Sequence, residues 1–166
     1  LPECRNSAPS GITANGTSIS PSTVATWSSN TAVQSTLVIA AEPYNACSAI
    51  QNMVSGMIVL VGRGECKFVA KAAAAQNAGA VGVIIVNNDE ANADDVIRMA
   101  TVTNQTVSIP VLMVSYNNGD LIKGLGSGTS VEFKFSLSGQ CGTPVLLQFL
   151  MTEPDWISAP RPVPLL

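Results

Sequence analysis

The sequence predicts an α/β fold, and three consecutive stretches of the chain carry this prediction. Gly56–Gly62 is a short apolar run bounded by glycines, with the length and β-branched content of a buried strand. An alanine-rich segment with strong helix propensity follows from Cys66 to Asn77, and Val81–Val86 reads as a second buried strand. Strand, helix and strand within about 30 residues are typical of a right-handed βαβ unit with parallel strands.

The part of the chain before this unit has a different composition. Residues 6–35 are rich in Ser, Thr, Asn, Gly and Ala, with few large apolar side chains. We therefore expect an irregular N-terminal segment, residues 1–36, with short edge strands around Ile19 and Val24. The core begins at Leu37-Val38-Ile39, and a turn is expected at Glu42–Asn45.

The predicted helix at Cys66–Asn77 has two kinds of face. Phe68, Ala72 and Ala75 are at helical spacing on one face, whose small side chains would let the helix lie close to a sheet. Lys67 and Lys71 are four residues apart and are expected on another face.

The elements that follow are shorter. Ile109–Val114 is a third apolar strand, and Ser115 is placed to cap a short helix with Leu121, Ile122 and Leu125 on its inner face. Residues 131–136 then alternate apolar and polar side chains, as in a strand with one solvated face.

The end of the predicted domain is marked by a change to proline. Val145–Met151 is a last apolar stretch, and four prolines follow within 13 residues. We place the domain at residues 37–151 and a Pro-rich tail or linker at 152–166.

Four cysteines, without C-x-x-C spacing, favour two disulfides in an oxidising compartment. Three connectivities are possible. Cys4 and Cys141 bracket the compact part of the chain, whereas Cys47 and Cys66 lie within it, so Cys4–Cys141 and Cys47–Cys66 are the favoured pairs. The first pair would tie the N-terminal segment to the domain.

Two N-x-[ST] sequons, at Asn15 and Asn104, predict glycosylation in a secretory pathway. The chain has neither an initiator Met nor a signal segment, so we expect a processed form or an excised fragment, secreted or lumenal, with its signal peptide removed. Its apolar runs are too short to span a bilayer, so any membrane anchor or further domain would lie outside it.

Composition excludes most catalytic chemistry. The chain has no histidine, so it cannot build a Ser-His-Asp triad, a Cys-His dyad or a histidine metal site. A net charge of −3 without a basic cluster argues against nucleic-acid binding. We expect no catalytic residue, no metal and no cofactor. The acidic loop Asp89–Asp95 fails the EF-hand pattern and is interpreted as a solvated loop, with a weak cation site as the alternative. Gly124–Gly128 lacks the residues of a phosphate loop and is interpreted as a flexible connection.

The most specific feature is Val61–Phe68, where a strand leaves the core, a glycine-flanked Arg63 sits on a turn, and Cys66 begins a helix. As a structural element this is a strand-to-helix turn held in place by a disulfide. It also sets Arg63 and Glu65 beside exposed turn amides, a place suited to recognition of a peptide backbone or a carboxylate.

With its surroundings, this segment resembles the protease-associated (PA) domain family. The residues that carry the resemblance run from about Ala46 to Phe135: Gly56–Phe68, Lys71, Ala75-Gln76, Ala78–Ala80, Val83–Asn88, Ile109-Pro110, Gly119 and Leu121. The resemblance implies a curved mixed sheet or open β-barrel flanked by short helices. Asn45-Ala46-Cys47 is similar to the upstream cysteine motif of many members, which supports the Cys47–Cys66 pair.

The resemblance also implies a non-catalytic role in peptide or protein binding, such as recognition or sorting of a substrate or cargo. In sorting receptors of this family a loop of the form Arg-Gly-x-Cys-x-Phe contacts cargo. The matching residues are Arg63, Gly64, Cys66 and Phe68. With Glu65 added and the disulfide cysteine left out, the predicted ligand site is Arg63, Gly64, Glu65 and Phe68. The alternative is a regulatory or substrate-access insert of a larger secreted peptidase.

Overall fold

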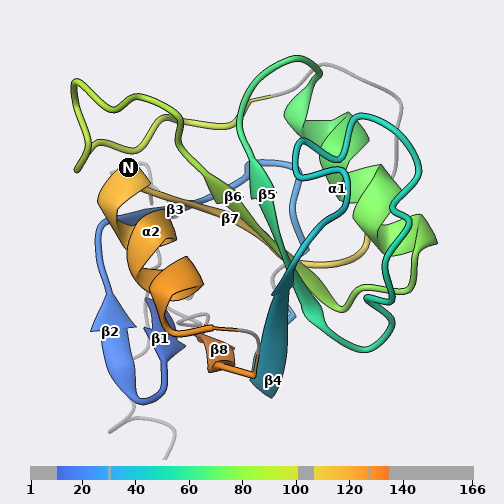
Figure 1. Ribbon diagram of the computed structural model, residues 1–166, viewed down its shortest axis with the longest axis horizontal. Coiled ribbons are helices and arrows are strands. Elements are labelled where there is room, and N and C mark those ends of the chain that lie inside the picture. The colour runs from blue at the N-terminus through green and yellow to red at the C-terminus, as the bar shows by residue number, and fades with distance from the viewer. Residues whose placement is uncertain (1–10, 30, 101–106, 127, 135–166) are drawn as a thin grey trace, which may run out of the picture. The chain divides into compact units, whose positions relative to one another are not determined.

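The computed structural model describes residues 11–29, 31–100, 107–126 and 128–134. Within them, eight strands form one sheet in the order β2-β1-β8-β4-β5-β6-β7-β3, with two helices beside it (Figure 1). The elements in chain order are β1 (Gly11–Ala14), β2 (Thr17–Ile19), β3 (Ser22–Val24), β4 (Val33–Ala40), β5 (Ile58–Gly62), α1 (Phe68–Asn77), β6 (Gly82–Val86), β7 (Val111–Val114), α2 (Tyr116–Gly124) and β8 (Ser130–Lys134).

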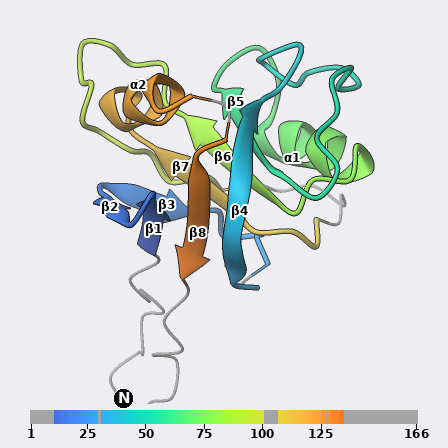
Figure 2. The same ribbon diagram turned by 60° about the horizontal axis from the view of Figure 1, so that its bottom comes forward.

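The sheet is mixed and curls into a nearly closed β-barrel. Strands β4, β5, β6 and β7 are parallel neighbours, which confirms the parallel pair predicted around the alanine-rich helix, and the remaining pairings are antiparallel. The two edge strands, β2 and β3, are separated in the chain only by Ser20 and Pro21. The two edges of the sheet therefore lie close together. Figure 2 shows β4 and β8 side by side along the barrel.

Two apolar clusters explain why the central strands have continuous apolar sequences. Alternate residues of β5, β6 and β7 point into the barrel, where they form a barrel-interior cluster that includes Ile58, Leu60, Ile84, Val86 and Phe133. The residues between them form an outer cluster with α1, which includes Val59, Val61, Val83, Ile85 and Ala72. Because both faces of these strands are covered, a polar residue has no solvated position along them.

The N-terminal part of the chain contributes more to the sheet than the sequence predicted. The edge strands expected around Ile19 and Val24 are β2 and β3. β1, however, is an interior strand between β2 and β8, and its Ile12 is fully buried. Residues 11–24 are therefore part of the barrel and are not irregular surface structure.

The helix α1 has the predicted face but not the predicted lysine positions. Ala72 and Ala75 are fully buried and Phe68 packs against the outer cluster, as expected from their spacing. Lys67 is exposed, whereas Lys71 is fully buried. The expectation that both lysines share a separate polar face was wrong, because the loop before Cys47 covers Lys71.

The helix α2 begins at the predicted cap, where the Ser115 side chain accepts a hydrogen bond from the Asn118 backbone N–H. Ile122 is buried in the barrel-interior cluster, but Leu121 and Leu125 are each nearly half exposed. The prediction of an inner face formed by all three was therefore wrong. α1 and α2 lie apart, with strands β5–β7 between them (Figures 1 and 2).

Some predictions concern residues outside the described ranges. These are the Cys4–Cys141 disulfide, the Asn104 sequon, Phe135, the apolar stretch Val145–Met151 and the tail at 152–166. Among the described residues, neither helix is long and apolar enough to cross a membrane.

Candidate functional site

Three polar side chains follow directly after three neighbouring parallel strands. Arg63 follows β5, Asn87 follows β6 and Ser115 follows β7. The last residues of these strands, Gly62, Val86 and Val114, are paired in register. The three polar residues therefore form a row at the carboxyl edge of the parallel strands, the edge where open α/β sheets bind their ligands.

The guanidinium of Arg63 is held by a neutral amide. Its Nη1 donates a 2.7 Å hydrogen bond to Oδ1 of Asn87, and Asn87 is buried and donates from Nδ2 to the carbonyl of Asp95. Among the described residues, no carboxylate lies within ion-pair distance of Arg63. Its positive charge is therefore oriented, partly exposed and not neutralised by a direct partner.

The acidic loop after β6 lies close to this arginine. The pKa of Asp89 is lowered, mainly by hydrogen bonds from the side chain and backbone of Asn92 and to a smaller degree by the charge of Arg63. Asp94 accepts a 2.8 Å hydrogen bond from the Asn117 amide at the start of α2. Within the described part of the chain, no three His, Cys, Asp or Glu side chains are grouped to hold a metal ion.

Gly64 and Glu65 form the turn between β5 and α1. Both have positive φ, +111° and +66°, and the first of these is a conformation that favours glycine. The exposed Glu65 carboxylate accepts a hydrogen bond from the Asn45 side chain. Arg63 and Glu65 are thus neighbours on one turn, as predicted, but each side chain bonds to an asparagine from a different segment.

A disulfide joins Cys47 to Cys66 and so links the loop after β4 to the beginning of α1. The backbone N–H of Cys47 also donates to Oδ1 of Asn45, 3.1 Å away. Together with the hydrogen bond from Asn45 to Glu65, the disulfide attaches the turn that carries Arg63 and Glu65 to the loop after β4.

Lys71 lies beneath this disulfide. Its Nζ donates to the backbone carbonyl of Asn45 and lies 3.5 Å from Sγ of Cys47. Burial lowers the pKa of Lys71, and the charge of Glu65 opposes that shift. A fully buried ammonium at this position had no signal in the sequence, because the helical spacing put Lys71 with the exposed Lys67.

The four predicted ligand residues therefore separate into two groups. Arg63, Gly64 and Glu65 form one turn at the carboxyl edge of the strands, whereas the Phe68 ring packs against the outer cluster under α1. Asn87 was not assigned a role from the sequence. Its position directly after a buried parallel strand was the available signal.

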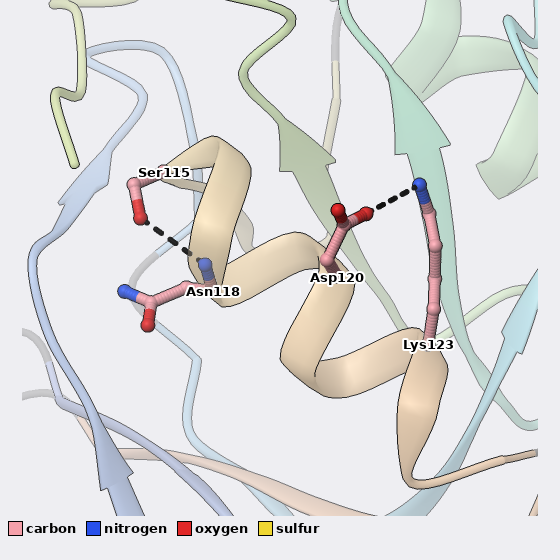
Figure 3. A network of polar contacts seen from close by, with 4 residues as sticks. All are labelled: Ser115, Asn118, Asp120 and Lys123. Atoms are coloured by element: carbon pink, nitrogen blue, oxygen red, sulfur yellow. Dashed lines mark hydrogen bonds and ion pairs between the residues drawn. The ribbon is translucent and has the colours of Figure 1, made fainter. Parts of the chain in front are cut away.

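A neighbouring surface connects this turn to α2. The Tyr44 ring packs on Gly62, where a Cβ atom in place of the glycine hydrogen would be 2.7 Å from Cε1 of the ring. Lys123 places its Nζ 4.8 Å from the centre of the same ring and 3.4 Å from Asp120, on the side of α2 drawn in Figure 3. Burial raises the pKa of the Tyr44 hydroxyl, and the Lys123 ammonium works in the opposite direction.

Beside Lys123 is a hollow of about 310 Å³ between the end of β4 and α2, with Ile39, Leu60 and Ile122 in its lining. The large apolar side chains that are exposed in the described structure all lie next in the chain to a lining residue. They are Leu37, Met53, Leu121 and Leu125. None of these four side chains belongs to the lining of the hollow, which is itself mostly apolar.

Comparison with solved structures supports this fold assignment. A zinc aminopeptidase from Bacillus subtilis superposes with a TM-score of 0.60 at 22% identity, over 76% of this chain and 30% of that one. A subtilisin-like protease, Apa1 from Pseudoalteromonas sp. AS-11, gives 0.59 at 19% identity, over 76% and 32%. At these identities the likeness concerns the fold alone, and it agrees with the predicted barrel flanked by short helices.

Sequence comparison finds closer relatives. Signal peptide peptidase-like 5 of Arabidopsis thaliana is 37% identical over 49% of this chain and 15% of its own length. ER degradation-enhancing alpha-mannosidase-like protein 3 of Xenopus laevis is 39% identical over 52% of this chain and 10% of its own. The match thus covers only a small part of each relative. The sequence model of the PA domain matches residues 33–122, more than half of the chain, and the chain therefore belongs to the PA domain family.

Proposed function

We propose that this PA domain is a non-catalytic binding module that recognises an extended peptide segment of a protein partner. The observation that carries the proposal is the Arg63 guanidinium, which a buried amide orients at the carboxyl edge of the strands without a carboxylate in contact among the described residues. An oriented, uncompensated guanidinium is suited to a charge-assisted hydrogen bond with a carboxylate or a peptide carbonyl.

The surface that leads from Arg63 to α2 supplies a second kind of contact. Tyr44 packs on the residue before Arg63, Lys123 lies over Tyr44, and Lys123 lines the apolar hollow. The bound segment therefore combines an acidic residue for Arg63 with an apolar side chain for the hollow. Gly64 and Glu65 provide the turn that positions Arg63, and Phe68 supports it from the core.

A secreted or lumenal location agrees with this role. A disulfide persists in an oxidising compartment, and one relative has an ER function in its name. Asn15, the first predicted glycosylation site, is exposed on the turn between β1 and β2. In this setting the partner is another protein of the secretory pathway, and no nucleic acid or cofactor is required.

The alternative is a regulatory or substrate-access insert of a larger secreted peptidase. It draws support from the fold of the aminopeptidase and subtilisin-like structures, of which the matched region is about a third. The reading frame on either side of residues 1 and 166 distinguishes the two functions, because an insert is flanked by the sequence of a catalytic domain.

The binding function is tested with a random-peptide phage library selected on the wild-type domain. We expect selected peptides to contain Asp or Glu near an apolar residue. Binding of one labelled peptide is then measured by fluorescence polarisation. Loss of a charged hydrogen bond is worth about 1.5–3 kcal/mol, so Arg63→Ala should weaken binding roughly tenfold to a hundredfold.

Arg98→Ala is the matched control, because Arg98 is an exposed arginine that, among the described residues, makes no ion pair with the turn that carries Arg63. It should bind as the wild type does. Equal affinity of Arg63→Ala and wild type, with unchanged melting temperatures, would exclude Arg63 as the ligand contact.

A further inference from the structure

The contact between Lys71 and the disulfide is not needed for peptide recognition at Arg63. Lys71 has no exposed surface, yet its ammonium points at one sulfur of a disulfide whose Cys47 is exposed. Among the described residues, its nearest partners are the carbonyl of Asn45 and that sulfur. Within the same part of the chain, the charge that acts on it is the Glu65 carboxylate, which itself bonds to Asn45.

A cation beside a disulfide sulfur changes the chemistry of that bond. Thiol–disulfide exchange is faster when the departing sulfur is stabilised as a thiolate. An ammonium within about 4–6 Å stabilises an anion and lowers the pKa of the corresponding thiol. At 3.5 Å from Sγ of Cys47, Lys71 is positioned to stabilise that sulfur as it leaves.

We infer that Cys47–Cys66 is a thiol–disulfide exchange site for a dithiol reductant, with Cys47 as the leaving sulfur and Lys71 as its activating contact. The thiolate of the dithiol attacks Sγ of Cys66, the Cys47–Cys66 bond breaks, and its electron pair leaves on Cys47 as a thiolate beside the Lys71 ammonium. The second thiol of the reductant, once deprotonated, then attacks the mixed disulfide and releases the Cys66 thiolate. The dithiol is oxidised to a disulfide, and the protein disulfide is reduced to two thiols.

The position of the disulfide allows this reaction without opening the fold. Cys47 is exposed and Cys66 is partly exposed, so an attacking thiol does not have to enter the core. The bond links a loop to the start of α1 and crosses no strand pair of the described barrel. Reduction therefore removes the covalent link between α1 and the Asn45–Cys47 loop, which holds Glu65, and breaks no strand pairing.

The first test compares rates of reduction by dithiothreitol at near-neutral pH, followed by alkylation and mass spectrometry. Lys71→Met keeps the length of the side chain but removes its charge, and it should be reduced roughly threefold to tenfold more slowly than the wild type. Lys67→Met is the matched control, since Lys67 is the exposed N-cap residue of the same helix, and its rate should be unchanged.

The direction of the change separates the two roles of Lys71. If Lys71 only pins the loop through Asn45, its loss loosens the loop and speeds reduction. An unchanged or faster rate in Lys71→Met would therefore overturn the inference. This test measures only the rate of disulfide reduction and not peptide binding at Arg63. The inference about Lys71 can therefore be judged even if the proposed peptide-binding function is wrong.

A second test requires no variant. The wild-type protein is treated briefly with a monothiol, and the mixed disulfide is trapped and mapped. The inference expects the added thiol on Cys66 and the free thiol on Cys47, and a majority of the opposite product contradicts it. A third test does use variants. In Cys66→Ser, the pH dependence of alkylation should give Cys47 a pKa below the usual value of about 8.5. Adding Lys71→Met should raise that pKa by about one unit. In the part of the chain that the structure describes, Lys71 is the charged group in contact with this sulfur, and Glu65 is the charge that acts on Lys71.

Discussion

Replacing Gly119 by alanine tests the close approach of α2 to the carboxyl end of β6. A Cβ atom at this position would lie 2.1 Å from Cγ1 and 2.8 Å from Cγ2 of Val86, far inside van der Waals contact. Val86 is buried between β5 and β7 in the barrel-interior cluster, so its methyl groups have little room to turn away. Either the helix or the strand must therefore move.

The size of the effect follows from two opposing contributions. Overpacking of a core costs about 1–3 kcal/mol, and a contact with both methyl groups belongs at the upper end of that range. Alanine in place of glycine inside a helix stabilises by about 1 kcal/mol. We expect a net loss of about 2 kcal/mol, which for a domain of this size lowers the melting temperature by about 4–8 °C.

Calorimetry or chemical denaturation of purified variants measures this loss. Gly124→Ala, at the end of the same helix, is the control, because its Cβ would have no neighbour within 4 Å, and it should be neutral or slightly stabilising. Adding Val86→Ala to Gly119→Ala removes the clash, so the double variant should lose less stability than the sum of the two single changes. Wild-type stability in Gly119→Ala would show that α2 does not pack against Val86 as described.

Two further predictions concern the polar groups of the site. Asn87→Ala removes the hydrogen-bond acceptor of Arg63 and the donor to the Asp95 carbonyl. It should lower the free energy of unfolding by about 1–3 kcal/mol, measured by thermal denaturation. Unchanged stability would contradict the anchoring of Arg63 by Asn87. Lys71 has a lower pKa in the folded protein than its usual 10.5, so between these two values the unfolded chain binds more protons and the contribution of this group to stability rises with pH. The free energy of unfolding of the wild type, relative to Lys71→Met, should therefore increase from neutral pH toward about pH 10. A difference that stays constant with pH would contradict a lowered pKa of Lys71 in the folded protein.

Local patterns were sufficient for the parallel strands and the helix between them. A run such as Ile58–Val61 is apolar at every position because both faces of β5 are covered. The sequence shows that both faces are buried even though it does not show which elements cover them. The cap at Ser115 and the helix after it were predictable for a similar reason, because the capping hydrogen bond joins residues three apart.

The candidate site was predictable only in part. Arg63, Gly64 and Glu65 are consecutive, so their placement on one turn follows from the strand and helix on either side. Their partners Asn87 and Asn45 are 24 and 20 residues away in the chain, and no local periodicity connects them. The exposure of Leu121 and Leu125 was missed because the spacing of apolar residues in a short helix cannot say which of them has a partner to pack against.

By itself, the sequence determined that this chain has no histidine chemistry, that it contains a βαβ unit and that it resembles the PA domain family. These properties depend on composition and on short-range order along the chain. Only the tertiary structure decided that β1 enters the barrel, that the sheet nearly closes through β2 and β3, and that Lys71 is buried under the disulfide. Each of these depends on long-range contacts, and side-chain patterns report that a residue is covered without identifying the distant group that covers it.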